Sequence, residues 1–344
     1  MSAPASVPAL APQAGKLRVL FVIPGDGQGS SMIFARRQAR NLASVGIEAD
    51  LFYLRSRTSP RQLLAEFRRF RSELARLRPA VIHAHYGTVT ALFAAAASGV
   101  LPLVITYRGS DLNPPPPSYG WRAQMRAACG VVFSQLAALR AQRIICVSHS
   151  LAKRLWWRRK TARILPTGVD AGIFWPQPRA LARKQLGWND LETVTLFNAG
   201  HNDPVKRLPL AIEAVEQARR TVPSLRMEIL NGSVDPDLVA VFMNAADCLL
   251  LTSVSEGSPT VIQEALACDL PVVTVEVGDV VERLKGVEDA RVAAADASVL
   301  AQALVHLVDP PRRSNGSEKV PEFCARRIAR ELQEIYHELA EVPK

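Results

Sequence analysis

The sequence lacks an apolar run long enough to cross a bilayer, which takes about 20 consecutive apolar residues. Its longest candidate, residues 88–105, is rich in Ala and is interrupted by Gly99 and Pro102. This stretch therefore predicts a buried helix followed by a strand. The first residues also lack the apolar core of a signal peptide. Because they are rich in Ala and Pro, we expect residues 1–16 to form a disordered tail.

Cysteine and aromatic residues are scarce as well. The cysteines show neither a C-x-x-C pair nor the spacing of metal ligands, and they occur at positions 129, 146, 248, 268 and 324. We interpret them as reduced core residues of a cytosolic protein. Aromatic residues make up 6% of the chain, and no segment resembles a nucleic-acid-binding module. We therefore expect neither a bound metal nor a nucleic-acid partner.

Negative charge is scarce in the first half of the chain. Residues 17–165 hold 23 Lys and Arg against 6 Asp and Glu, whereas residues 166–344 hold 18 against 26. The basic half includes a helical pattern at 62–77 and the segment 154–163, in which Trp156 and Trp157 stand among basic residues. Both patterns are typical of proteins that bind anionic membrane surfaces. A solvated basic face, a partly buried helix and a nucleic-acid patch are the alternative interpretations.

Strand and helix patterns alternate along the whole chain. Apolar runs predict buried strands at 17–23, 49–54, 80–83, 103–107, 143–148, 193–198, 225–230, 248–251 and 271–277. Amphipathic periodicity predicts helices at 32–45, 62–77, from 208 onward, 297–308 and 322–339. Two such series in tandem predict an α/β protein with two Rossmann-like domains that face a central cleft.

The Pro- and Gly-rich residues 164–178 separate the two series. We expect a first domain at 17–165, an interdomain connection at 166–190 and a second domain at 191–320. The remaining residues, 321–344, predict a C-terminal helix that can pack back on the first domain.

Polar loops follow several predicted strands, at the edge where open α/β sheets bind ligands. The glycine loop at 24–31 follows the first strand, and its spacing differs from the dinucleotide fingerprint. It predicts either a phosphate site or a turn that needs glycine. Lys206 stands just before a helix start, which suits a diphosphate, with a plain surface lysine as the alternative. Arg108 and Asp111 follow another strand.

Residues 248–278 combine a strand, a polar loop, a helix and a second strand. Ser258 is a plausible N-cap, and Pro259 suits the first helical position because its missing N–H costs nothing there. Glu256 lies in the loop and Glu264 two turns into the helix. A glycine, helix-start N–H groups and two carboxylates eight positions apart could together hold a hydroxyl-rich ligand.

This stretch resembles the paired-glutamate signature of retaining glycosyltransferases of family 4, which have the GT-B fold. The signature lies within SEGSPTVIQEALACDLPVV at 255–273. Five further segments resemble family motifs in the expected order, namely the glycine loop at 25–30, HAH at 83–85, RGSD at 108–111, ILPTGVDAGIFWP at 164–176 and GHNDPVK at 200–206. The chain departs from the family where Arg108 replaces His, His201 replaces Arg and Thr167 replaces Asn, and where VGD at 277–279 replaces a paired glycine.

The resemblance implies roles for individual residues. Lys206 would neutralise the donor diphosphate, Glu256 would bind hydroxyls of the donor sugar, and Glu264 would bind the ribose, so that the two glutamates form two ends of one pocket. Catalytic residues are then Glu256, Arg108 and Lys206. Donor-binding residues are Glu264, Gly257, Ser258, Pro259, Thr260, His201, Gly27, Gly29 and Asn231. The acceptor-side residues are His85 and Asp111. No metal or cofactor is implied.

The resemblance also implies a function. We expect a retaining hexosyltransferase that moves a sugar from a nucleotide-diphosphate donor to a glycolipid or polysaccharide-precursor acceptor, at the cytoplasmic face of the membrane. Its basic first domain would bind the acceptor and an anionic membrane surface, and its acidic second domain the donor. A sugar epimerase or phosphorylase of the same fold is one alternative. A non-catalytic nucleic-acid- or membrane-binding protein on the same scaffold is another.

Overall fold

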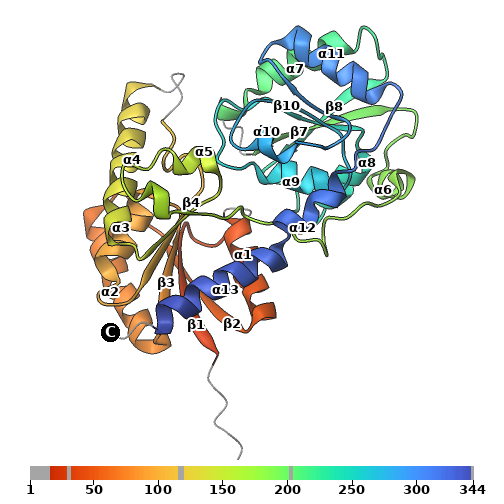
Figure 1. Ribbon diagram of the computed structural model, residues 1–344. Coiled ribbons are helices and arrows are strands. Elements are labelled where there is room, and N and C mark those ends of the chain that lie inside the picture. Colours follow the sequence, from red (N-terminus) through yellow and green to blue (C-terminus); the bar gives the residue numbers. More distant parts are fainter. Residues whose placement is uncertain (1–15, 29–31, 115–119, 201–203, 342–344) are drawn as a thin grey trace, which may run out of the picture.

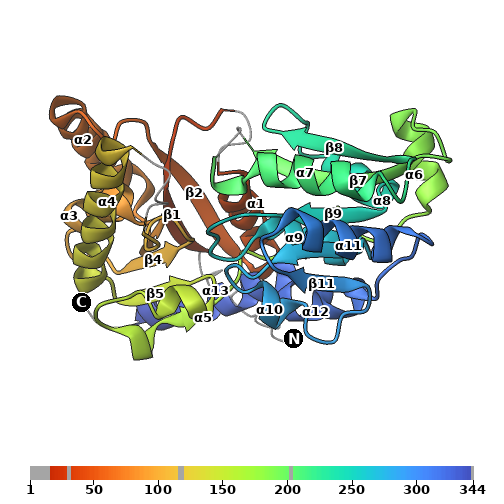
Figure 2. The same ribbon diagram turned by 90° about the horizontal axis from the view of Figure 1, so that it is seen from above.

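The computed structural model describes residues 16–28, 32–114, 120–200 and 204–341. Two α/β domains lie next to each other, each built on a parallel sheet with helices on both faces (Figure 1, and Figure 2 from above). The predicted fold class is therefore confirmed. The disordered tail expected at 1–16 lies, apart from Lys16, outside the described residues.

The first sheet has the strand order β2-β1-β3-β4-β5-β6, and its neighbouring strands are parallel. From β1 the chain continues to β2, on one side of β1 within the sheet, and then to β3, on the other side of β1. The topological switch point therefore lies between β1 and β3. The strands are β1 (Leu17–Pro24), β2 (Ile47–Leu54), β3 (Val81–His85), β4 (Leu103–Tyr107), β5 (Arg143–Cys146) and β6 (Arg163–Ile164). The helices are α1 (Ile33–Leu42), α2 (Pro60–Leu77), α3 (Thr88–Ala97), α4 (Trp121–Arg140) and α5 (His149–Ala152).

The second sheet has the order β11-β10-β9-β7-β8 and is also parallel, with its switch point between β7 and β9. Its strands are β7 (Thr193–Gly200), β8 (Leu225–Asn231), β9 (Cys248–Leu251), β10 (Val272–Val275) and β11 (Ala290–Ala293). The helices are α6 (Arg179–Leu186), α7 (Leu208–Ala218), α8 (Val239–Ala245), α9 (Thr260–Ala267), α10 (Val280–Arg283), α11 (Ala297–Val308) and α12 (Val320–Phe323).

The chain crosses between the domains twice, and the two crossings are hydrogen-bonded to each other. Val169 N donates to Phe323 O at 3.0 Å, and Ala325 N donates to Val169 O at 2.7 Å. After the second crossing, α13 (Ala325–Glu341) returns to the first domain beside β1 (Figure 1). Its apolar stripe, which includes Leu332 and Tyr336, belongs to the same core cluster as Phe21 of β1.

Several local predictions need correction. Ser258 is not the N-cap of α9: the helix begins at Thr260 after Pro259, and the Ser258 hydroxyl accepts a hydrogen bond from Gln263 Nε2 at 3.2 Å. Pro259 therefore precedes the helix and is not its first residue. The segment 154–163 is mostly irregular, with a 3-10 turn at Arg159–Thr161. Helix α4 had no counterpart among the sequence predictions.

The five cysteines are free thiols, and Cys146, Cys248 and Cys268 are buried. The prediction of core positions is confirmed for these three cysteines, of which Cys146 and Cys248 lie in strands, and is wrong for Cys129, which is exposed. In the described part of the chain, no helix has the length and apolarity needed to cross a bilayer.

Candidate active site

The switch point of the second sheet brings Lys206 and Glu256 together. Lys206 follows β7 and Glu256 follows β9, and these two strands are neighbours, so their carboxyl-end loops meet. Lys206 Nζ lies 2.5 Å from Glu256 Oε1. The Thr252 hydroxyl donates to Lys206 O at 2.6 Å, and Val254 N donates to Val205 O at 2.8 Å. These bonds fix one loop against the other and thereby fix the ion pair.

Arg108 supplies a second cation from the first domain. It follows β4, and its guanidinium donates from Nη1 to the Thr167 hydroxyl at 2.9 Å and from Nη2 to His85 Nδ1 at 2.8 Å. The guanidinium also stacks on the Phe34 ring, 4.2 Å from its centre. Burial lowers the pKa of Arg108 to about 9, which leaves it charged at neutral pH. Arg108 is thus a rigidly held cation.

A cavity of about 690 Å³ is lined by both domains, with Arg108 from the first and Lys206 and Glu256 from the second. Its volume is in the range of small-molecule sites. Helix α4 contributes Arg126 and Phe133 to the lining. The cavity can therefore hold a ligand between a cationic wall and a hydroxyl-binding carboxylate.

The two domains touch at the floor of this cleft through glycines. A Cβ added to Gly257 would lie 1.9 Å from Arg108 O, so the backbones meet at a distance that no side chain allows. Next to this contact, Asn113 Nδ2 donates to the Ser255 hydroxyl at 3.0 Å and to Glu256 O at 3.3 Å. The loop that carries Glu256 is therefore held by both domains.

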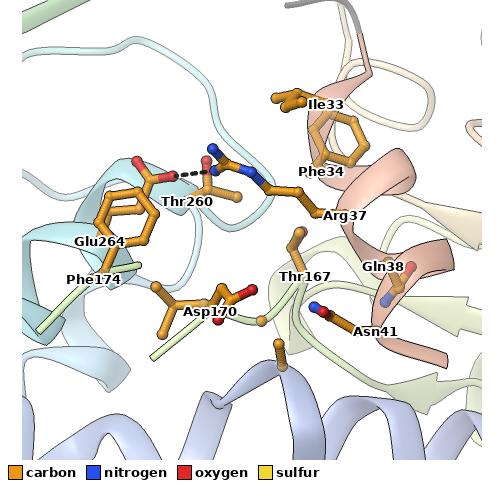
Figure 3. Close-up of a pocket in the computed structure, with 13 residues that line it drawn as sticks. Ile33, Phe34, Arg37, Gln38, Asn41, Thr167, Asp170, Phe174, Thr260 and Glu264 are labelled. Atoms are coloured by element: carbon orange, nitrogen blue, oxygen red, sulfur yellow. Dashed lines mark ion pairs between the residues drawn. The ribbon is translucent and has the colours of Figure 1, made fainter. Parts of the chain in front are cut away.

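Glu264 lies in a second, smaller cavity of about 60 Å³ (Figure 3). Arg37 extends from α1 toward it, and Arg37 Nη1 lies 4.0 Å from Glu264 Oε1. Thr260, Asp170 and Phe174 also line this cavity. Burial raises the pKa of Glu264 to about 7, and the positive charge of Arg37 opposes that shift.

The structure does not place Glu256 and Glu264 in one pocket, as the sequence had led us to expect. Glu256 lines the large cleft, whereas Glu264 lines the small cavity, and Phe34 contributes to the lining of both. Arg37 of α1 points into the space beside Glu264 (Figure 3), and Phe34 of the same helix stands where the two cavities adjoin.

The predicted acceptor-side residues, His85 and Asp111, need correction because both are fully buried. Asp111 accepts backbone hydrogen bonds from Gly87, Arg108 and Gly109, at distances from 2.8 to 3.1 Å. It therefore braces the loop that carries Arg108. Burial holds the pKa of His85 well below its usual value, so the ring is neutral and its Nδ1 accepts from Arg108. Both residues position the cleft wall and have no surface for an acceptor.

The other predicted residues are placed as follows. Gly257 lines the cleft and Thr260 lines the small cavity, whereas Ser258 is buried beside them. Gly27, at a φ of +87°, packs against the Tyr53 ring. Asn231 Oδ1 accepts from Ser233 N at 3.1 Å and shapes the turn after β8. Gly29 and His201 lie outside the described residues.

Sequence reasoning missed several residues of the two cavities. On α1, Phe34 stacks on Arg108 and Arg37 lies beside Glu264 of the second domain. After β4, Asn113 donates a hydrogen bond to Ser255 of the second domain. Their signal in the sequence is weak because each depends on a partner far away in the chain. Arg126 and Phe133 were missed because α4 was not predicted.

Comparison with known proteins agrees with this architecture. The family model described as Glycosyltransferase Family 4 matches residues 28–172, and the one described as Glycosyl transferases group 1 matches residues 189–310. The putative teichuronic acid biosynthesis glycosyltransferase TuaC of Bacillus subtilis (strain 168) is 30% identical over 224 residues. That match covers 59% of this chain and 55% of TuaC, so the chain spans about half the length of this curated relative.

Two solved structures are similar in fold. Sucrose-phosphate synthase from Thermosynechococcus elongatus superposes with a TM-score of 0.78 at 20% identity, covering 94% of this chain and 99% of that one. HepE from Anabaena, in complex with UDP-glucose, has a TM-score of 0.69 at 17% identity, covering 94% and 100%. The two matched domains and the shared two-domain fold show that this chain belongs to the family 4, group 1 glycosyltransferases with the GT-B fold.

Proposed function

We propose that this protein is a retaining glycosyltransferase that uses a nucleotide-diphosphate sugar as donor. The observation that carries the proposal is the Lys206–Glu256 pair at the switch point, which lines a cleft of about 690 Å³ together with Arg108. The pair offers a cation for a diphosphate and a carboxylate for sugar hydroxyls in one place. The complexes of HepE with UDP and with UDP-glucose support a donor of this class.

In the proposed reaction, the bond between the sugar C1 and the diphosphate oxygen breaks, and the acceptor oxygen bonds to C1 on the same face. The acceptor proton passes to the departing phosphate oxygen. Lys206 and Arg108 stabilise the negative charge that grows on the leaving group. Glu256 accepts hydrogen bonds from the sugar hydroxyls and fixes the sugar. The proposal assigns the neutralising charge to side chains, with no metal or other cofactor.

We further propose that the acceptor is a glycolipid or polysaccharide precursor at an anionic membrane surface. The relative TuaC is named for teichuronic acid biosynthesis, which supports a polysaccharide-related acceptor. The surface that we assign to the membrane differs from the α2 pattern expected from the sequence. It is an exposed apolar stripe along α4, formed by Trp121, Met125, Val132, Leu136 and Leu139.

The surroundings of this α4 stripe match an anionic surface. Gln135, a buried residue of α4, bonds to both Arg154 O and Trp156 N at 3.0 Å, which ties the segment that carries the exposed Trp156 to this helix. Residues 112–169 contain ten Lys and Arg but no Asp or Glu. Apolar side chains flanked by basic ones suit the boundary between headgroups and acyl chains. On this basis we propose a peripheral location at the cytoplasmic face of the membrane.

Product analysis tests the proposed reaction. The protein is incubated with a panel of nucleotide sugars, with and without membrane lipid extract as acceptor, and the products are separated by chromatography. We expect sugar transfer with retained anomeric configuration, and a loss of at least 100-fold for Glu256→Gln. Conversion of a nucleotide sugar without acceptor would favour an epimerase, and near-normal transfer by Glu256→Gln would contradict the assignment.

A further inference from the structure

Arg37 joins the two domains at the Glu264 cavity. Its Nη1 lies 4.0 Å from Glu264 Oε1 on α9. Its Nη2 donates to Pro236 O at 3.2 Å and lies 3.8 Å from Asp237 Oδ1, both in the loop between β8 and α8. Its guanidinium carbon also lies 5.8 Å from the centre of the Phe174 ring. One side chain of the first domain thus contacts three separate segments beyond the first domain, and Figure 3 shows it between Glu264 and Phe174 on one side and α1 on the other.

Arg37 also fills the space that a nucleoside would need. The cavity beside Glu264 measures about 60 Å³, which is room for a few water molecules only. Sites for drug-sized ligands and cofactors measure roughly 300–1,000 Å³. A nucleoside whose ribose bonds to Glu264 therefore does not fit while Arg37 occupies its observed position.

We propose that Arg37 competes with the nucleoside for Glu264, so that a nucleotide binds by displacing the Arg37 side chain. This inference rests on the proposed function, in which Glu264 binds the ribose. Ribose hydroxyls donate to the carboxylate that the guanidinium leaves. Arg37 thereby sets the affinity for the donor from the opposite domain, and donor binding loosens a contact between the domains.

The environment of the pair explains why it can be displaced. Both side chains are largely buried, with 15% of Arg37 and 19% of Glu264 exposed. The charge of Arg37 favours the ionised form of Glu264, against the effect of burial, which raises the pKa of this carboxyl to about 7. At 4.0 Å the pair lacks a short, charge-assisted hydrogen bond. An ion pair of this kind reduces the apparent affinity of a competing ligand by about 3- to 10-fold.

Calorimetric titration of this chain tests the competition. The wild-type protein is titrated with UDP, GDP and ADP, and the tightest of these is then titrated into Arg37→Ala. We expect binding about 3- to 10-fold tighter in the variant. The gain should be equal for the corresponding nucleoside monophosphate, because Arg37 acts at the nucleoside end. Arg40→Ala, an exposed arginine on the same helix, is the matched control and should bind as the wild type does.

Unchanged or weaker binding by Arg37→Ala would overturn the proposal, and weaker binding would make Arg37 a ligand of the nucleotide. In a Glu264→Ala background, the gain from Arg37→Ala should vanish, and a persistent gain would also overturn it. Failure of all three nucleotides to bind both proteins would contradict the nucleotide donor itself and the displacement with it. Binding without a gain contradicts the competition alone.

Discussion

Lys206 Nζ lies 2.5 Å from Glu256 Oε1, so the cation that suits a diphosphate and the carboxylate that suits a sugar are bonded to each other. A nucleotide sugar has to separate this pair, or fit around it, to use both groups. The pair comes from loops after β7 and β9, and its geometry follows from the switch point between those strands.

Removal of the Lys206 side chain should therefore weaken binding of the terminal phosphate more than binding of the nucleoside. In Lys206→Ala, we expect UDP to bind about 10- to 100-fold more weakly, because a charge-assisted bond is lost and Glu256 then repels phosphate. UMP should lose much less. Calorimetric titration measures both affinities, with the exposed Lys285→Ala as control. Equal losses for UDP and UMP would show that Lys206 does not bind the terminal phosphate.

The glycine contact between the domains should be intolerant of any side chain. A Cβ at Gly257 would lie 1.9 Å from Arg108 O, so Gly257→Ala must push the two loops apart. We expect kcat/KM to fall at least 10-fold, because misplacement of a site by about 1 Å is costly, with little change in Tm. At Gly120, a Cβ would meet no described atom within 4 Å. Gly120→Ala therefore serves as control, and equal activity of both variants would contradict this expectation.

Glu264 should reduce stability above neutral pH. Burial raises its folded pKa to about 7, above the unfolded value, so the native state binds the proton more tightly. This favours folding at low pH, and the advantage is lost as the pH rises through about 7. Between pH 5 and pH 8, the free energy of unfolding of Glu264→Gln should therefore rise relative to that of the wild type by on the order of 1–3 kcal/mol.

Thermal unfolding at the two pH values measures this gain. The difference between the Tm of Glu264→Gln and that of the wild type should be a few degrees larger at pH 8 than at pH 5. Glu216→Gln, on the exposed side of α7, is the matched control. The same constant offset at both pH values would show that the Glu264 carboxyl is not titrating in this range.

The apolar stripe of α4 should control membrane binding. Leu136 and Leu139 are 46% and 59% exposed, so changing both to Glu should leave Tm nearly unchanged. Co-sedimentation with vesicles of phosphatidylglycerol and phosphatidylcholine should fall at least 10-fold, because charged side chains replace apolar ones at the bilayer boundary. Leu191→Glu, on the second domain and 85% exposed, is the control. Equal binding to pure phosphatidylcholine would contradict the role of the basic residues.

The sequence predicted the fold because its signals are local. Apolar runs such as 17–23 and 248–251 are buried strands in the structure, and a parallel sheet needs little more than such runs separated by helices. The Lys206–Glu256 site was predictable for the same reason, since each residue follows a recognisable strand. Helix α4 was not predicted, because alanines and exposed apolar residues obscure its amphipathic period.

The cross-domain contacts were less predictable. In the sequence, Arg37 is an ordinary basic residue on an amphipathic helix. Its contact with Glu264 becomes evident only in the structure, because Glu264 belongs to the second domain. Arg108 and Thr167 each depart from the family motifs, and the sequence treats them as two separate exceptions. In the structure they are one change, because Arg108 Nη1 donates to the Thr167 hydroxyl at 2.9 Å.

The return of α13 to the first domain has a consequence for the order of synthesis. Residues of α13 such as Leu332 and Tyr336 complete the cluster that contains Val19 and Phe21. The ribosome makes the second domain, residues 193–308, before it makes α13. Part of one face of the first sheet therefore stays uncovered until the second domain has been made, although domains generally fold in the order in which they emerge. The first domain is thus completed after the second.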